Sequence, residues 1–187
     1  RKAVKDHTVA IELAPTCAEA YFNRGCAQGR VDNCDLAIAD FSQAIRLDPE
    51  MAKAFANRAR AYLATGDIRA ALTDCDTVVR LDASSANAYA NRGTVRFHAG
   101  ILDAAIDDFT EAIRLDPGMT SCYRLRARAY EAEGKWSRAI ADYTRLLELD
   151  PRNVGSLLSR AEAHARQGAL DAAIDDFTRA IHLDPDN

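Results

Sequence analysis

The side chains of this sequence that are able to bind a metal ion are its histidines and cysteines, and their spacing does not favour such a site. No two cysteines form a C-x-x-C pair, and no two histidines have a metal-ligand spacing. The residues concerned are His7, His98, His164 and His182, together with Cys17, Cys26, Cys34, Cys75 and Cys122. We predict no metal site and interpret the cysteines as small core residues in a reducing compartment, with a metal or disulfide role as the alternative.

Catalytic chemistry would need a group of side chains that stands apart from any internal repetition. The sequence has no glycine-rich phosphate loop and no G-x-S-x-G nucleophile motif. Its 28 aspartates and glutamates are numerous, but most recur at a fixed interval. We predict that the chain is not an enzyme and has no catalytic residues and no cofactor.

The composition is that of a folded protein with an acidic balance. Of the 187 residues, 48% are hydrophobic and 28% are charged, and the net charge is −4, which argues against a nucleic-acid partner. No apolar run approaches the ~18 residues of a membrane span, and residues 1–13 lack the apolar core of a signal peptide, so we predict a cytoplasmic protein. The chain does not begin with methionine, and we expect it to be part of a longer one.

The carboxylates recur because the whole sequence repeats every 34 residues. The repeated residues are Arg24, Arg58, Arg92, Arg126 and Arg160; Ala37, Ala71, Ala105, Ala139 and Ala173; Asp40, Asp74, Asp108, Asp142 and Asp176; and Leu47, Leu81, Leu115, Leu149 and Leu183. An aspartate follows each of these leucines, and a proline comes next in every unit except the second, which has Ala83. The repeats are 18–51, 52–85, 86–119, 120–153 and 154–187, preceded by a half repeat, 1–17.

Each repeat has the pattern of two helices. Residues 104–115 place apolar side chains at the helical period, which is typical of an amphipathic helix. Gly66, Gly100, Gly134 and Gly168 fall between the two helices, where the chain needs a left-handed residue. The Asp-Pro pair ends the second helix, because a residue before proline disfavours the helical region. No segment alternates with a period of two, so we predict no strands.

This pattern resembles the tetratricopeptide repeat family over all 187 residues. The resemblance is carried by an early aromatic (Tyr21, Phe55, Tyr89, Tyr123), by small residues at the helix crossing (Gly25, Ala59, Gly93, Ala127, Ala161), by a second-helix aromatic (Phe41, Phe109, Tyr143, Phe177) and by the closing proline. It implies an all-α fold, a right-handed α-solenoid of 34-residue helix-turn-helix repeats, forming a single domain over 1–187. It also implies a concave groove lined by the first helices, which binds a peptide or a partner protein.

Residues identical in every repeat are expected to build the repeat, and groove residues that vary are candidates for binding. We therefore interpret the repeated arginines and aspartates as ion pairs that hold the helices in register, with ligand binding as the alternative. The family geometry places Asn23, Asn57 and Asn91 at one groove position of successive repeats. Each amide has a donor and an acceptor for a peptide backbone. The alternative is that asparagine serves only the architecture there.

An apolar centre with arginines beside it is the second candidate feature of the groove. The family geometry places Leu63 and Phe97 in the middle of the groove and Arg60, Arg124 and Arg128 beside them. This arrangement suits a peptide with one hydrophobic anchor and acidic neighbours. The family's two-carboxylate clamp is not expected, because only one of its five positions is matched in either window of three repeats.

The predicted function is a protein–protein interaction scaffold that binds an extended peptide or partner protein in its groove. One alternative is an assembly module that stacks end to end, since neither end of the sequence has a polar capping helix, and we expect weak self-association through those ends. Another is the targeting region of a larger enzyme.

Overall fold

The computed structural model describes residues 2–30 and 33–184. These residues form eleven α-helices and no strand, which confirms the all-α prediction. The helices are α1 (Lys2–Leu13), α2 (Ala18–Gly29), α3 (Cys34–Leu47), α4 (Ala52–Thr65), α5 (Ile68–Leu81), α6 (Ala86–His98), α7 (Leu102–Leu115), α8 (Thr120–Ala132), α9 (Trp136–Leu149), α10 (Val154–Gln167) and α11 (Leu170–Leu183).

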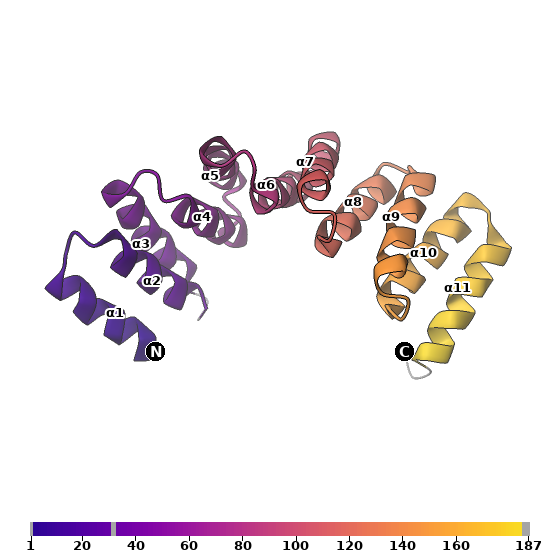
Figure 1. Ribbon diagram of the computed structural model, residues 1–187, viewed down its shortest axis with the longest axis horizontal. Helices are drawn as coiled ribbons and strands as arrows, with labels where there is room; N and C mark the ends of the chain where they lie inside the picture. The colour runs from indigo at the N-terminus through magenta and orange to yellow at the C-terminus, as the bar shows by residue number, and fades with distance from the viewer. Residues whose placement is uncertain (1, 31–32, 185–187) are drawn as a thin grey trace. The chain divides into compact units, whose positions relative to one another are not determined.

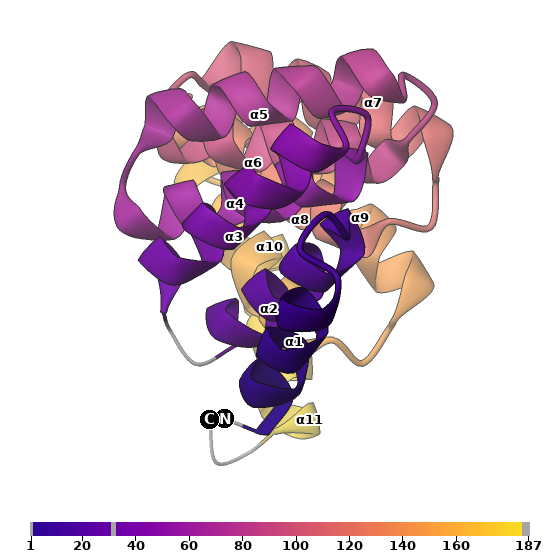
Figure 2. The ribbon, with the colours of Figure 1, turned by 90° about the vertical axis from the view of Figure 1, so that its left-hand side faces the viewer.

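The chain divides into two compact units, Arg1–Val95 and Arg96–Asn187. In the first unit each helix from α2 to α5 packs on the helix before it, and in the second unit the same holds from α8 to α11. Figure 1 shows this arrangement for α1 to α3 and for α9 to α11, and Figure 2 shows α1 lying against α2. The boundary between the units falls within α6, in the third repeat, and the single domain over 1–187 stays a prediction.

Glycine at the turn between paired helices adopts the left-handed conformation, as predicted. Gly66 has φ 84° and Gly168 has φ 87°, and the N–H of each donates to carbonyls in the last turn of the preceding helix. Gly100 and Gly134 also have positive φ. A residue with a Cβ would be strained in this conformation, so the turn depends on glycine.

Aspartate, more than proline, sets the end of the second helices. The Oδ1 atoms of Asp48, Asp116 and Asp150 accept a hydrogen bond from the backbone N–H two residues later. Asp82 does the same at 3.0 Å although Ala83 replaces the proline, and its φ of −144° matches the −137° of Asp48. The side-chain acceptor therefore produces the same turn without the ring.

The core of each repeat is formed where a small residue lets the two helices approach closely. Ala37, Ala71, Ala105 and Ala139 are all fully buried, and so is the second-helix residue four positions later: Phe41, Cys75, Phe109 or Tyr143. In the first repeat the Phe41 ring lies against Gly25: a Cβ at Gly25 would be only 2.8 Å from Cε1 of Phe41. The small residues predicted at the crossing are thus needed for packing.

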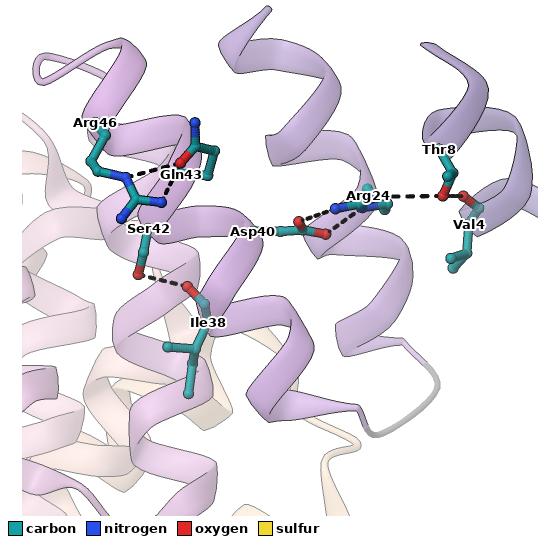
Figure 3. A network of polar contacts seen from close by, with 8 residues as sticks. All are labelled: Val4, Thr8, Arg24, Ile38, Asp40, Ser42, Gln43 and Arg46. Atoms are coloured by element: carbon teal, nitrogen blue, oxygen red, sulfur yellow. Dashed lines mark hydrogen bonds and ion pairs between the residues drawn. The ribbon is translucent and has the colours of Figure 1, made fainter. Parts of the chain in front are cut away.

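The repeated arginine and aspartate form a bidentate ion pair within a repeat. In the first repeat the Nε and Nη2 atoms of Arg24 donate to the two carboxylate oxygens of Asp40 at 2.8 and 2.6 Å (Figure 3). The same geometry joins Arg58 to Asp74, Arg126 to Asp142 and Arg160 to Asp176. In these four pairs the aspartate side chain is at most 7% exposed. The pairing confirms the structural interpretation of these residues.

The third nitrogen of each guanidinium extends the contact to the preceding repeat. Nη1 of Arg58 donates to Oγ of Ser42 at 2.9 Å, and Nη1 of Arg24 donates to Oγ1 of Thr8 at 3.4 Å. Arg126 and Arg160 reach Thr110 and Thr144 in the same way. The hydroxyls of Thr8 and Ser42 in turn donate to carbonyls four residues back, on Val4 and Ile38 (Figure 3). One arginine thus connects three consecutive helices, which the sequence did not suggest.

The third repeat varies this arrangement. Asp76 stands where the other repeats have the hydroxyl, and Nη1 of Arg92 donates to it at 3.0 Å. Arg96 stands at the register of Tyr62 and Tyr130, and its Nη1 donates to Oδ2 of Asp108 at 2.8 Å. Here carboxylate and guanidinium groups replace a hydroxyl and a phenol.

Removing one arginine should therefore destabilise the fold. We expect Arg58→Ala to lower the free energy of unfolding by about 2–4 kcal/mol, because Asp74 would stay buried without its partner. Urea unfolding followed by far-ultraviolet circular dichroism measures this loss. The control is Arg60→Ala on the same helix, whose exposed side chain should change stability by less than about 0.5 kcal/mol. Equal stability of the two variants would contradict a structural role for the ion pair.

Candidate functional site

The three asparagines predicted to bind a peptide backbone lie in the first unit, on α2, α4 and α6, and their amides differ in availability. Asn57 is engaged by its own helix: its Nδ2 donates to the carbonyl of Lys53 at 2.8 Å, and its Oδ1 accepts from Arg60 at 3.1 Å. The amides of Asn23 and Asn91 have no hydrogen-bond partner within the described part of the chain. A ligand would bind these two directly but would have to displace contacts at Asn57.

Leu63 packs against the core more than the sequence suggested. Its side chain is half-buried against a cluster formed by Ala59, Ala71, Cys75 and Val95. Leu63 therefore contributes to the packing of α4 on its neighbours, and it offers a ligand only part of its surface.

A cavity of about 400 Å³ opens in the first unit between α2, α3 and α4. We call it the first-unit pocket. The apolar part of its lining consists of Gly25, Gly29, Ala37, Phe41, Ala61 and Ala64. Cys26 and Cys34 also line it, together with the polar residues Arg30, Asn57 and Arg60. Two residues predicted from the sequence to bind a ligand, Asn57 and Arg60, therefore line this pocket.

The pocket exists because the first repeat lacks two large side chains. Gly29 stands at the register of Leu63 and Phe97, and among the described residues no neighbouring atom lies within 4 Å of a Cβ built on it. Cys34 stands at the register of Ile68, Leu102, Trp136 and Leu170. The sequence-based prediction concerned groove side chains able to bind a ligand, so it missed a pocket that follows from small residues at these two registers.

The pKa of the Cys26 thiol depends on the charges around the first-unit pocket. Burial raises its pKa, and the nearby charges of Arg30, Arg60 and Lys53 oppose that rise. Lys53 is already ion-paired with Glu19. The two arginines therefore give the pocket its positive character.

In the second unit two of the predicted residues form a stacked pair. The guanidinium of Arg128 lies 5.5 Å from the centroid of the Phe97 ring, within the range of a cation–π contact. Arg128 is exposed and Phe97 is half-buried. The pair presents a charged group on an apolar support, which suits a ligand with a carboxylate beside an apolar side chain.

Arg124, the last predicted residue, lines a cavity of about 270 Å³ between α8, α9 and α10. The hydroxyl-bearing residues Ser121, Ser159 and the buried Tyr143 also line this cavity. Burial raises the pKa of Glu131, and its interaction with Tyr143 opposes that rise. This cavity is polar and differs in chemistry from the first-unit pocket.

Residues 2–30 and 33–184 contain neither a candidate metal site nor a candidate membrane span. No group of three or more histidine, cysteine, aspartate or glutamate side chains there is arranged to hold a metal ion. None of the helices in that part has the length and apolar character needed to cross a bilayer.

The helix pairs, their 34-residue period and the first-helix cavities define an α-solenoid. The sequence matches the tetratricopeptide repeat family over residues 22–85, 56–120 and 124–187, and the chain belongs to that family. Members of this family are in general protein-interaction scaffolds, and this chain is a scaffold of that general class.

Solved structures of the same architecture resemble the chain at low identity. MamA is 24% identical with a TM-score of 0.83, covering 90% of this chain and 92% of that one. MamA of Desulfovibrio magneticus RS-1 is 19% identical with a TM-score of 0.83, covering 90% and 95%. YrrB is 20% identical with a TM-score of 0.80, covering 99% and 95%. These likenesses establish the fold alone. No curated protein sequence matches the chain significantly.

The two glycines of the pocket wall allow a matched test of its geometry. Gly25→Ala should be less stable than Gly29→Ala by about 1–3 kcal/mol, because its Cβ would overlap the buried Phe41 ring. Gly29→Ala should be neutral or stabilising by up to about 1 kcal/mol, since alanine favours the helix and its Cβ meets open space. Thermal unfolding of both variants gives the comparison. A Gly29→Ala variant as unstable as Gly25→Ala would mean that the pocket is closed in solution.

Proposed function

We propose that this chain is a scaffold that binds an extended peptide, or an extended segment of a partner protein, along the face formed by its first helices. The proposal rests on one observation: the residues that recur in every repeat bind one another, whereas the residues that vary are exposed. The repeated arginines and aspartates bind one another. The side chains that vary between repeats, among them Arg60, Arg124 and Arg128, are exposed on the first helices.

The chemistry of this face supports a ligand that combines apolar and acidic groups. Arg60 lines an apolar pocket, Arg124 lines a polar cavity and Arg128 lies on an aromatic ring. Hydrogen bonds to the free amides of Asn23 and Asn91 would add only about 0.5–1.5 kcal/mol each. Affinity and selectivity would therefore depend mostly on the arginines and the apolar contacts. YrrB is described as a TPR protein with an unusual peptide-binding site, which is consistent with this use of the fold.

Reversing one groove charge should test the proposal. A random peptide library selected on the immobilised protein should yield peptides that join acidic and apolar residues. Arg128→Glu should weaken such a peptide about tenfold and make its binding less dependent on salt, because one attractive charge becomes repulsive. Fluorescence polarisation over a salt series measures both effects.

The matched control is Arg152→Glu, which makes the same charge change at an exposed residue in the turn after α9. Its affinity should stay within about twofold of the wild type, since Arg152 is not on a first helix and an exposed charge is screened by salt. Selected peptides that bind both variants as well as wild type would place the binding site elsewhere.

A second candidate function, self-association through α11, rests on one observation. Ile181 is 60% exposed, whereas Leu147 at the same register of α9 is 6% exposed, and Ile174 and Leu170 beside it are also exposed. Ile106, at the register of Ile174, is only 8% exposed, so the apolar face of α11 would be covered by a second copy of the chain through apolar contact.

Charged residues on this face should prevent that association. We expect the wild-type chain to show weak, concentration-dependent dimers in sedimentation velocity and the double variant Ile174→Asp, Ile181→Asp to stay monomeric. The unfolding curve of the double variant should be close to that of the wild type, because both side chains are exposed. A wild-type chain that is monomeric at every concentration would remove this candidate.

A further inference from the structure

We propose that the first-unit pocket is a specificity pocket that receives one bulky apolar side chain of the bound peptide, while a nearby carboxylate of the same peptide binds Arg30 and Arg60. This inference rests on the proposed peptide-binding function and adds the class of residue that the ligand must carry.

The size of the pocket fits a single side chain. Its volume of about 400 Å³ is near the lower end of the roughly 300–1,000 Å³ of pockets that hold a whole small ligand. The space corresponds to what the protein itself omits: glycine at position 29 and cysteine at position 34, where the second repeat has Leu63 and Ile68. A leucine, phenylalanine or tryptophan of the ligand would replace this missing apolar volume.

The walls favour an aromatic side chain. Phe41 forms the floor and is fixed in place by its contact with Gly25. A second ring can pack against it in an offset or edge-on arrangement. The sulfur atoms of Cys26 and Cys34 also line the pocket, and sulfur makes favourable contacts at the edge of an aromatic ring.

The charge of the lining favours an acidic neighbour. Although the chain has a net charge of −4, the lining residues that the structure describes include two arginines and no aspartate or glutamate. Arg30 is exposed, and Arg60 is oriented by its hydrogen bond to Asn57. Successive side chains of an extended peptide point to opposite faces, and those two residues apart share one face at a spacing of about 6.6 Å. A carboxylate two residues from the anchor therefore lies on the side of the arginines.

A defined peptide series tests the proposal. The probes are N-acetylated, C-amidated peptides Gly-Glu-Ser-Xaa-Ser-Glu-Gly with Xaa as glycine, alanine, leucine, phenylalanine or tryptophan. On wild type the affinity should rise about tenfold or more from glycine to phenylalanine, the gain expected when a large apolar side chain is buried. Replacing both glutamates with glutamine should weaken the phenylalanine peptide about three- to tenfold.

The filled variant Gly29→Leu, Cys34→Ile gives the pocket the residues of the second repeat. It should melt at or above the wild-type temperature and should bind all five peptides with the same low affinity. Arg30→Glu should weaken the acidic peptides most. The matched control is Arg69→Glu, an equal charge change at an exposed residue outside the pocket, in the first turn of α5, where an acidic side chain suits the helix dipole.

Thiol labelling of the wild-type protein provides a readout that needs no variant. The phenylalanine peptide should slow maleimide labelling of Cys26 and Cys34, whereas the glycine peptide should not. Cys17 is exposed and outside the pocket, so its rate should stay unchanged. Burial raises the pKa of Cys122 to about 11, which leaves that thiol protonated and unreactive throughout.

The outcomes separate this inference from the proposed function. Unchanged labelling of Cys26 and Cys34, or equal selectivity in the wild-type and filled variants, overturns the pocket assignment. If the library-selected peptides still bind and still respond to Arg128→Glu, the groove function stands without this pocket. If no selected peptide responds to any groove variant, the proposed function fails as well.

Discussion

The bidentate contact between an arginine of a first helix and a buried aspartate of the second is the interaction on which each repeat depends. The carboxylate is almost fully removed from water, so it is stable only with both oxygens satisfied. The remaining nitrogen of the same guanidinium reaches a hydroxyl of the preceding repeat. Fixing one planar group therefore fixes the positions of three helices, because a guanidinium cannot donate in three directions unless its acceptors are in register.

This arrangement separates architecture from recognition. The arginine points between the helices and occupies one first-helix register, so the neighbouring registers are free to vary. The third repeat shows how much variation the scaffold accepts. Asp76 replaces the hydroxyl of the other repeats and Arg96 stands where the second and fourth repeats have tyrosine, yet α6 and α7 have lengths similar to those of their counterparts. Both changes exchange one polar contact for another, and the alanine-lined crossing at Ala105 is unaffected.

The features that the sequence predicted are those in which one residue type has one physical role. Gly66 and Gly168 have positive φ, Asp48 ends a helix, and Arg58 pairs with Asp74. The properties of the groove were less accessible. Three identical asparagines were expected to act alike, but the amide of Asn57 is engaged by the nearby Arg60 and Lys53. Leu63 was expected on the groove floor, but Val95 of the next first helix takes part in burying it. Such outcomes depend on rotamers and neighbours, which a repeat pattern does not contain.

One register shows how such a scaffold diversifies its surface. Position 29 is a glycine that leaves a pocket, and Leu63 at the same register packs into the core. Phe97 supports the guanidinium of Arg128, and Glu131 is a half-buried carboxyl whose pKa is raised by burial. Four repeats thus place a void, an apolar contact, a charged platform and a half-buried acid at one structural position. In the first, second and fourth repeats these changes leave the bidentate arginine–aspartate contact in place. A solenoid built in this way gains specificity as readily by omitting a side chain as by adding one.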